Sequence, residues 1–464
     1  MPKLGRIARF ALTLVLASTW LLSAADPCLA ILSKAEEREM GRKVLEEVHK
    51  EFRVLDDPYV TDYLVRMGAR LVKAGQIRAF DANFYVVADA RINAFAIHGG
   101  HVFVTSETLL MSSDESELAG VIAHELGHVE GRHLAYQMES ATKLNIATLA
   151  AVLAGIFLMR TPQASAAVTS FALAGAQTKM LQYSRADEED ADRRGLHTLS
   201  EAGYDGWGLV RFMDTIRKEA PTPEGVPAYL FTHPLPENRS AYLSDALGGT
   251  RPLPRDPASV SRLWRVQGRV LAQDPRPWGL SMMEKRAADN PANASAQLAF
   301  AVVLRGAGRY GDAERTITAA RALAPEDPEI LHEAATIELL RGRRAEGLAI
   351  LEGLRTKGIA TEPALRELGW NYLEAEEGEK ALGVYAEIAK RSEGRPPWDR
   401  LDYYRGLALG KAGREGEAHQ TLGDYYRRTG DPQLAVKHYR EALRLLPPGP
   451  ARDPVEQALR ELQA

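Results

Sequence analysis

Small residues recur at a fixed interval along the second half of the chain, and this period constrains the fold more than any other feature. Each of the first three steps is 34 residues long, and the positions are Gly279, Ala313, Gly347 and Ala381. Two further small residues follow after 37 and then another 17 positions, at Ala418 and Ala435. A period of this length indicates a solenoid, in which each repeat buries its apolar face against its neighbours.

The period is that of tetratricopeptide helix pairs, with a small residue opening the second helix of each pair. Glycines stand where the chain would turn between paired helices, at Gly308, Gly342 and Gly413. The short step before Ala435 indicates a helix shared between neighbouring pairs, followed by a terminal cap. We therefore predict an all-α array over residues 259–464. Such an array usually presents a groove to a peptide or protein, and the alternative is a spacer without a ligand.

Length and composition place a second domain before this array. A chain of 464 residues is long for one core, and prolines and glycines crowd together in residues 248–259, which marks a linker. We expect domains over residues 31–250 and 259–464. The net charge of −4 carries no basic excess, so we expect no nucleic-acid partner.

The first thirty residues read as an export signal. Lys3, Arg6 and Arg9 precede an apolar run over residues 10–22, and small residues suited to a signal peptidase follow. Cleavage after Ala25 or after Ala30 fits, and we favour Ala30 because soluble helical chemistry begins there. The predicted compartment is the periplasm; the alternative is an uncleaved membrane anchor, for which the run is short.

The pattern over residues 31–140 predicts helices around a small sheet. Apolar residues at helical spacing indicate helices over 35–52 and 57–74, and β-branched and aromatic runs indicate strands over 84–87, 94–97 and 101–105. Gly99 and Gly100 are placed for a tight hairpin turn. A helix follows, and Ser112 with Glu115 three residues later signals a capping box at its start.

Two apolar blocks lie within residues 144–176. They are short for membrane-spanning helices, so the favoured interpretation is buried helices or helices that cover the site. A hairpin that dips into a bilayer, with peripheral membrane contact, is the alternative. A polar helix is predicted next, over residues 183–199.

The stretch "HELGH", residues 124–128, is a candidate metal site. Positions i and i+4 share a helix face, so His124 and His128 can direct their imidazoles at one ion, while Glu125 lies beside it as a base for water. His133 falls nine residues after His124, about half a turn round the same helix, so we expect a structural or surface histidine there.

A catalytic zinc site needs a third protein ligand and an open position. The helix over 183–199 carries five acids near its start, and helical phase chooses among them. Glu188 and Asp192 lie on a face that is otherwise small or apolar, whereas Glu189 lies on a wet face. We predict Glu188 as the ligand and Asp192 as acceptor for the second N–H of a ligand histidine; a solvated acidic helix is the alternative.

The pattern His124-Glu125-x-x-His128 with Glu188-x-x-x-Asp192 resembles the zinc metallopeptidases of the CAAX-protease/HtpX type. Residues 93–109 and 231–239 look like further blocks of that family, and the resemblance covers roughly residues 31–250. The export signal and the repeat array make the chain most similar to the periplasmic branch. The resemblance implies an α+β fold, a mainly helical zincin-type protease domain with a small β-sheet, ahead of the all-α array. It also implies one Zn²⁺ per chain and peptide hydrolysis in misassembled outer-membrane proteins.

The same residues support a mechanism and a substrate site. Glu125 would act as general base, and His233 and Arg239 are candidate donors to the oxyanion; His233 could instead occupy the open zinc position and keep the enzyme latent. A substrate strand could add to the sheet near Asn93, Ala94 and Phe95 or at the Gly99–Gly100 hairpin. His98 and His101 flank that hairpin and are expected to be exposed turn residues rather than ligands.

Two functions fit these features. The first is a periplasmic zinc endopeptidase whose array recruits unfolded or misassembled substrates, or the outer-membrane assembly machinery. The second is a chaperone or scaffold in which the array is primary and the protease domain is latent. The intact motif favours the first, because a scaffold has no use for a base beside two metal ligands.

Overall fold

The structure, a computed structural model, describes most of the chain after the first 32 residues. The described residues are 33–140, 183–218, Tyr229, His233, 239–392 and 399–463. The predicted export signal and the apolar blocks of residues 144–176 lie outside them. Within the described part of the chain, no helix combines the length and apolar character that a membrane span requires.

The chain divides into two compact units. The first comprises Met1–Asp56 and Thr61–Ser259, and the second comprises Asp57–Val60 and Val260–Ala464. The described helices and strands that start before residue 259 are, in chain order, α2 (Lys34–Glu51), α3 (Pro58–Ala74), β1 (Asn83–Val87), β2 (Ala94–Ile97), β3 (His101–Thr105), α4 (Ser106–Met111), α5 (Glu115–Gly131), α6 (His133–Ser140), α10 (Arg185–Glu201), α11 (Trp207–Lys218), α13 (Arg239–Ala246) and α14 (Pro257–Gln273). The fold class predicted from the sequence is confirmed: a mainly helical unit with a small sheet, then a helical array.

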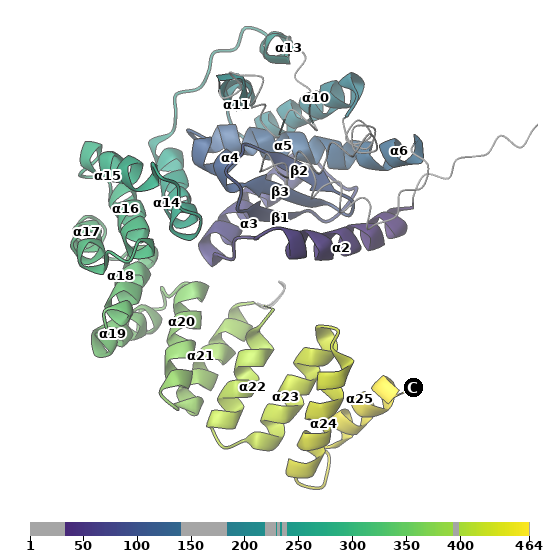
Figure 1. Ribbon diagram of the computed structural model, residues 1–464, viewed down its shortest axis with the longest axis vertical. Coiled ribbons are helices and arrows are strands. Elements are labelled where there is room, and N and C mark those ends of the chain that lie inside the picture. Colours follow the sequence, from purple (N-terminus) through teal and green to yellow (C-terminus); the bar gives the residue numbers. More distant parts are fainter. Residues whose placement is uncertain are drawn as a thin grey trace, which may run out of the picture. The chain divides into compact units, whose positions relative to one another are not determined.

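The three strands form a sheet in the order β1-β3-β2, with β1 parallel and β2 antiparallel to β3. Figure 1 shows the sheet between α2 and α5. Val44 and Val48 of α2 pack with Phe95 and Phe103 on one side, and α5 contacts β2 and β3. Among the described strands, this order leaves β2 at an edge of the sheet, with β3 as its neighbour.

The predicted strands and hairpin agree with the structure. The first strand begins one residue before the predicted start, and the other two have the predicted bounds. Gly99 and Gly100 have φ angles of 81° and 85°, a backbone region that favours glycine. The predicted helix start is wrong by two residues: Asp114, not Ser112, caps α5, because Ser112 ends the preceding helix α4. Asp114 accepts a hydrogen bond from the Glu117 N–H.

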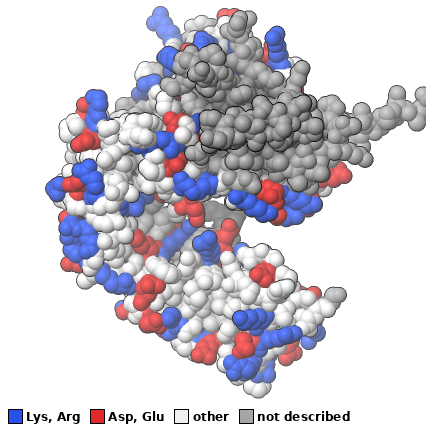
Figure 2. Space-filling view, viewed as in Figure 1, with Lys and Arg blue, Asp and Glu red and all other residues white. Residues whose placement is uncertain are grey.

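The second unit is an array of helices packed in antiparallel pairs (Figure 1). Its helices after α14 are α15 (Gly279–Asp289), α16 (Ala294–Gly306), α17 (Tyr310–Leu323), α18 (Pro328–Leu340), α19 (Arg344–Thr356), α20 (Glu362–Glu374), α21 (Gly378–Arg391), α22 (Leu401–Lys411), α23 (Glu415–Arg428), α24 (Pro432–Leu445) and α25 (Asp453–Gln463). On the face drawn in Figure 2, positive and negative side chains are interspersed over this array.

The repeated small residues do what the period predicts. Ala313, Ala381 and Ala435 are fully buried in the first turns of α17, α21 and α24. The turn glycines Gly308 and Gly342 have φ angles of 74° and 80°. Side-chain caps also recur every 34 residues, at Asn293, Asp327 and Thr361. The amphipathic helix α25 ends the described array, in the place of the predicted cap.

Candidate metal centre

Helix α5 brings two imidazoles and a carboxylate into the interior of the first unit. His124, Glu125 and His128 are 0–2% exposed, because α10 and α11 pack on the helix. One helical turn separates the histidines, and their Nε2 atoms lie 3.1 Å apart. Two imidazole nitrogens this close, buried together, form a pair of donors for one ion.

Two glycines let α10 approach α5 closely. A Cβ atom on Gly127 would lie 2.7 Å from the Ala191 carbonyl oxygen, and a Cβ on Gly195 would lie 3.0 Å from the His124 nitrogen. Side chains at either position would force the helices apart. The close crossing turns Glu188 toward the histidines: its Oε1 lies 3.5 Å from His128 Nε2, and its Oε2 lies 3.5 Å from His124 Nε2.

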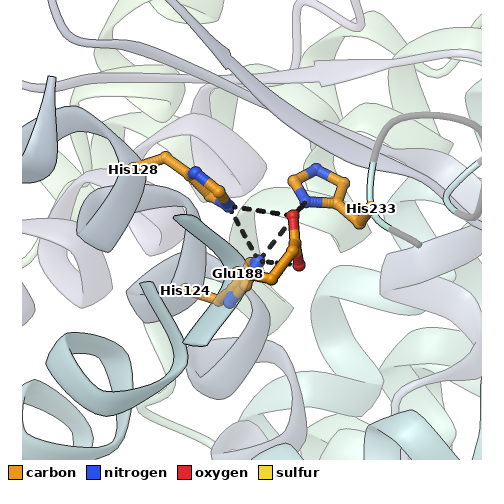
Figure 3. A group of neighbouring side chains, drawn as sticks. All are labelled: His124, His128, Glu188 and His233. Carbon is orange, nitrogen blue, oxygen red and sulfur yellow. Dashed lines mark hydrogen bonds and ion pairs between the residues drawn. The ribbon is translucent and has the colours of Figure 1, made fainter. Parts of the chain in front are cut away.

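A fourth residue joins the group, and it comes from a distant part of the sequence. His233 Nδ1 lies 2.9 Å from Glu188 Oε1 and 3.4 Å from His124 Nε2. Figure 3 shows the four side chains converging on one point. One ligand atom from each residue lies within 4.8 Å of all the others, and all four residues are buried.

This donor set fits a zinc ion. Ligand atoms at about 2.0–2.2 Å from zinc lie about 3.3–3.6 Å apart at tetrahedral angles. Five of the six pairwise spacings in the group, all except that between His128 and His233, run from 2.9 to 3.5 Å and are close to that range. Three imidazoles with one carboxylate suit Zn²⁺ better than Mg²⁺ or Ca²⁺, which prefer oxygen ligands.

A second layer of buried groups holds the first in place. Asp192 Oδ1 lies 2.8 Å from His124 Nδ1, the ring nitrogen that faces away from the group. Arg239 contacts both Glu188 and Asp192. Its Nη1 is 2.7 Å from Glu188 Oε2, and its guanidinium donates to both carboxylate oxygens of Asp192. Tyr242 also donates to Asp192. This network fixes the tautomer of His124 and the rotamer of Glu188.

The sequence suggested Arg239 as a candidate donor to the oxyanion, and that role stays a prediction. The guanidinium is 1% exposed and forms ion pairs with Glu188 and Asp192, contacts that favour a positioning role. The sequence block that suggested Arg239 as a donor contains no hint of this pairing. The residues between His233 and Arg239 lie outside the described part of the chain.

His133 does not join the four-residue group, but its position differs from the expected one in detail. Helix α5 ends at Gly131, and the next residue, Arg132, has a φ angle of 52°, so His133 begins α6 instead of continuing α5. Its Nδ1 lies 2.9 Å from His128 Nδ1, and its Nε2 lies 3.2 Å from Asp190. His133 thus orients His128 from behind, as Asp192 orients His124.

Burial and neighbouring charges shift the pKa values in this group in opposite directions. Burial disfavours a charge on His124, but Asp192 and Glu188 outweigh it and raise its pKa to about 9. Burial holds the pKa of His128 well below its usual value. Burial also opposes the charge on Glu188, yet His233, His124 and His128 hold its pKa well below the usual range. Glu188 is thus a carboxylate, the form that binds metal.

Glu125 is set apart from the other acids. Burial raises its pKa, and neither carboxylate oxygen has a hydrogen-bond partner among the described residues. Its Oε1 lies 3.4 Å from His233 Nε2. A buried carboxylate with a raised pKa beside a metal group is suited to accept a proton.

The predicted substrate-binding residues lie on the edge strand and its turn. Asn93 precedes β2, Ala94 and Phe95 belong to it, and the three are 0–5% exposed. The Asn93 carboxamide has no hydrogen-bond partner among the described residues. Next to it, the Ile92 carbonyl accepts a hydrogen bond from the Tyr229 N–H. Tyr229 therefore lies against the start of β2.

Sequence reasoning missed three features of this site. Tyr183 stacks on His128 with ring centroids 3.9 Å apart, and Tyr229 stacks on His233 at 4.5 Å. A tyrosine outside any motif gives no signal in one sequence. The third feature is His98, expected to be exposed but only 3% accessible. The glycine inside "HELGH" was a usable signal, because glycine in a helix interior usually marks a close contact.

The first unit is similar to known peptidases. The model of peptidase family M48 matches residues 58–247, and a tetratricopeptide repeat model matches residues 416–448. The beta-barrel assembly-enhancing protease of Escherichia coli is 29% identical over 357 residues, which cover 76% of this chain and 73% of that protein. The protein of the same name from Yersinia pestis is 31% identical over 335 residues, covering 71% and 68%. Mitochondrial metalloendopeptidase OMA1 of Schizosaccharomyces pombe is 30% identical over 172 residues, covering 36% and 48%.

Proposed function

Because this chain belongs to peptidase family M48 and is a metalloendopeptidase, we propose that it uses one zinc ion to hydrolyse unfolded or misassembled envelope proteins. The convergence of His124, His128 and Glu188 on one point carries the proposal. The printed name of its bacterial relatives, beta-barrel assembly-enhancing protease, supports outer-membrane proteins as substrates. The predicted export signal supports a periplasmic location.

We assign His124, His128 and Glu188 as the protein ligands and Asp192 as the group that orients His124. When bound, zinc lowers the pKa of water and polarises a carbonyl group. Glu125 accepts the proton of the attacking water, which its raised pKa favours, and returns it to the leaving amine. Arg239 acts as a positioning residue, because it holds Glu188 and Asp192 in place.

The edge strand offers the substrate a backbone template. An extended peptide that pairs with Ala94 and Phe95 of β2 would run past α5 and the four-residue group. Main-chain pairing gives little sequence selectivity, which suits unfolded substrates. The Gly99–Gly100 turn, at the far end of the strand, limits how far such pairing extends.

His233 supports latency as part of the proposal. Its Nδ1 would supply a fourth protein donor to a bound ion, so a substrate carbonyl or water would need His233 to move away. This position favours the latent-ligand role over a role as oxyanion donor. The same position of His233 supports the second candidate function, a scaffold in which the array binds client proteins while the protease stays latent.

The helical array supports a binding role for the second unit. We propose that its repeats bind unfolded or misassembled chains, or components of the outer-membrane assembly machinery. The family model of the tetratricopeptide repeat matches its last part, and this repeat class acts through protein contacts.

The proposal is tested by incubating a denatured outer-membrane protein with the zinc-loaded full chain. We expect slow cleavage by the wild type, faster cleavage by His233→Ala and at least about 100-fold slower cleavage by Glu125→Gln, because one loses the fourth donor and the other the base. Metal content, measured in parallel, should be equal in the wild type and Glu125→Gln. Equal cleavage by Glu125→Gln would refute the assignment of the base. Binding of the client without cleavage by any of the three chains would favour the scaffold.

A further inference from the structure

A small cavity lies between the edge strand and the metal-binding helix. The end of β2 and its turn form one wall with Ala96, Ile97 and His98, and α5 forms another with His128 and Val129. The cavity has a volume of about 20 Å³. A single water needs about 10–15 Å³, so the cavity accepts one small group.

His98 is the polar feature of this cavity that the fold leaves unsatisfied. Its side chain is 3% exposed, and neither ring nitrogen has a hydrogen-bond partner among the described residues. Burial lowers its pKa to about 4, so near neutral pH the ring is uncharged and offers one donor and one acceptor. Glu37 and Arg132, which also line the cavity, pair with each other.

Leaving such a group unpaired is costly, and buried polar groups in native proteins are nearly always satisfied. The ion pair gives both Glu37 and Arg132 a charged partner. The ring nitrogens of His98, in contrast, lack hydrogen-bond partners among the described residues, and a polar group bound in the cavity would supply one. The neighbouring wall contains His128, a proposed metal ligand, so that group would lie beside the reacting centre.

We propose that this cavity receives one substrate side chain next to the cleaved bond and that His98 selects a small hydroxyl-bearing residue, serine, at that position. The inference rests on the proposed function, because it needs a substrate strand along β2. A strand paired with Ala94 and Phe95 would direct alternate side chains toward α5, and both His98 and His128 line the cavity on that side of the strand. Serine fills the volume and can both donate to and accept from a neutral imidazole.

The volume of the cavity limits the size of the side chain, and the imidazole of His98 selects for a hydroxyl group. The small volume excludes leucine, methionine and phenylalanine side chains, while alanine fits without a hydrogen bond. One neutral hydrogen bond changes binding by about 2- to 10-fold. We therefore expect cleavage at serine to exceed that at alanine by roughly this factor, and cleavage at large residues to be rarer still.

The test maps the cleavage sites of the zinc-loaded full chain on a mixture of peptides, with mass spectrometry. Three variants separate the two effects. His98→Ala removes the imidazole and enlarges the cavity, whereas Val129→Ala enlarges the cavity from the helix side and keeps the imidazole. His101→Ala is the matched control, because His101 contacts Tyr85 and does not line the cavity.

We expect His98→Ala to lose the preference for serine over alanine and to accept leucine at the selected position. Val129→Ala should accept larger residues yet keep serine above alanine, and His101→Ala should match the wild type. An unchanged site profile in both cavity variants would overturn the inference and make the cavity a water site, while leaving the proposed function intact. Absence of any cleavage by the wild type would overturn the proposed function and this inference with it. If His98→Ala does not fold, the profile of Val129→Ala still decides whether the cavity selects the substrate.

Discussion

Burial is what distinguishes Glu188 from the other acids of α10. Glu188 and Asp192 are fully buried, whereas Glu189, one residue away, faces solvent. A buried carboxylate needs a positive partner, and Arg239 supplies one without occupying the oxygen that faces His128 and His233. The cost of burial is thus met by groups that leave Glu188 available to a metal ion.

Glu188→Ala removes this oxygen, so the chain should lose zinc. We expect the bound metal after dialysis to fall at least about tenfold, because outer-layer changes alone cost 10–100-fold in affinity. Atomic absorption on the purified chain measures it. Glu189→Ala is the control and should retain the full content of metal; similar metal content in both variants would remove Glu188 from the ligand set.

His98 predicts a dependence of stability on pH. Burial lowers its pKa to about 4, below the value of about 6.5 in an unfolded chain. The unfolded chain therefore binds more protons between these values, so the stability that His98 contributes is present above pH 6.5 and lost as the pH falls toward 4. From pH 7 to pH 4, the wild type should lose roughly 3 kcal/mol more unfolding free energy than His98→Leu.

Urea unfolding with a chelator present measures this difference without interference from bound metal. His101→Ala should follow the wild type, since it leaves His98 in place. Parallel pH profiles for the wild type and His98→Leu would contradict the prediction.

At the scale of single elements, the helix-to-helix turns of the array use one backbone conformation. Gly308 and Gly342 adopt positive φ angles, and 34 residues later Glu376 does the same with a φ of 61°. A side chain in this region costs about 1 kcal/mol relative to glycine. The side chains of Glu376 and Lys411 form an ion pair but are 42–70% exposed, so the pair adds little to the free energy of unfolding.

Glu376→Gly should therefore raise the free energy of unfolding of the array by about 0.5–1 kcal/mol. The reverse change at the matched position, Gly342→Glu, should lower it by about 1 kcal/mol or more. Denaturant unfolding followed by circular dichroism reports both. A loss of stability in Glu376→Gly would show that its ion pair outweighs the backbone strain.

At the scale of the whole molecule, the chain has separate hydrophobic cores in its two units. One gathers α2 and the sheet, and others run along the array. The four-residue group belongs to the first unit alone. A ligand stabilises only the unit that binds it, by about 2.7 kcal/mol at a concentration 100 times its dissociation constant.

Removal of metal should therefore act on one thermal transition. In scanning calorimetry we expect two transitions, and EDTA should lower the Tm of one by roughly 5–10 °C while leaving the other in place. Glu188→Ala should reproduce the shift without EDTA. A single transition that moves as a whole would show that the units unfold together.

The sequence by itself determined the elements and the repeat. Helical and strand periodicity placed β2 and β3 to the residue, and the 34-residue period with its turn glycines predicted the array, because these signals depend on local geometry. Helical phase also separated Glu188 and Asp192 from Glu189. The start of α5 was misplaced because Ser112 and Asp114 are both good caps, and only the end of α4 decides between them.

The tertiary structure decided how the site is completed. The pairing of Arg239 with the acids, the approach of His233 to Glu188 and the burial of His98 join residues that lie far apart in the chain. Spacing along a sequence carries no information on such contacts, because they depend on how helices and loops pack. The break after Gly131, which turned His133 toward His128, likewise depends on the packing of the element that follows.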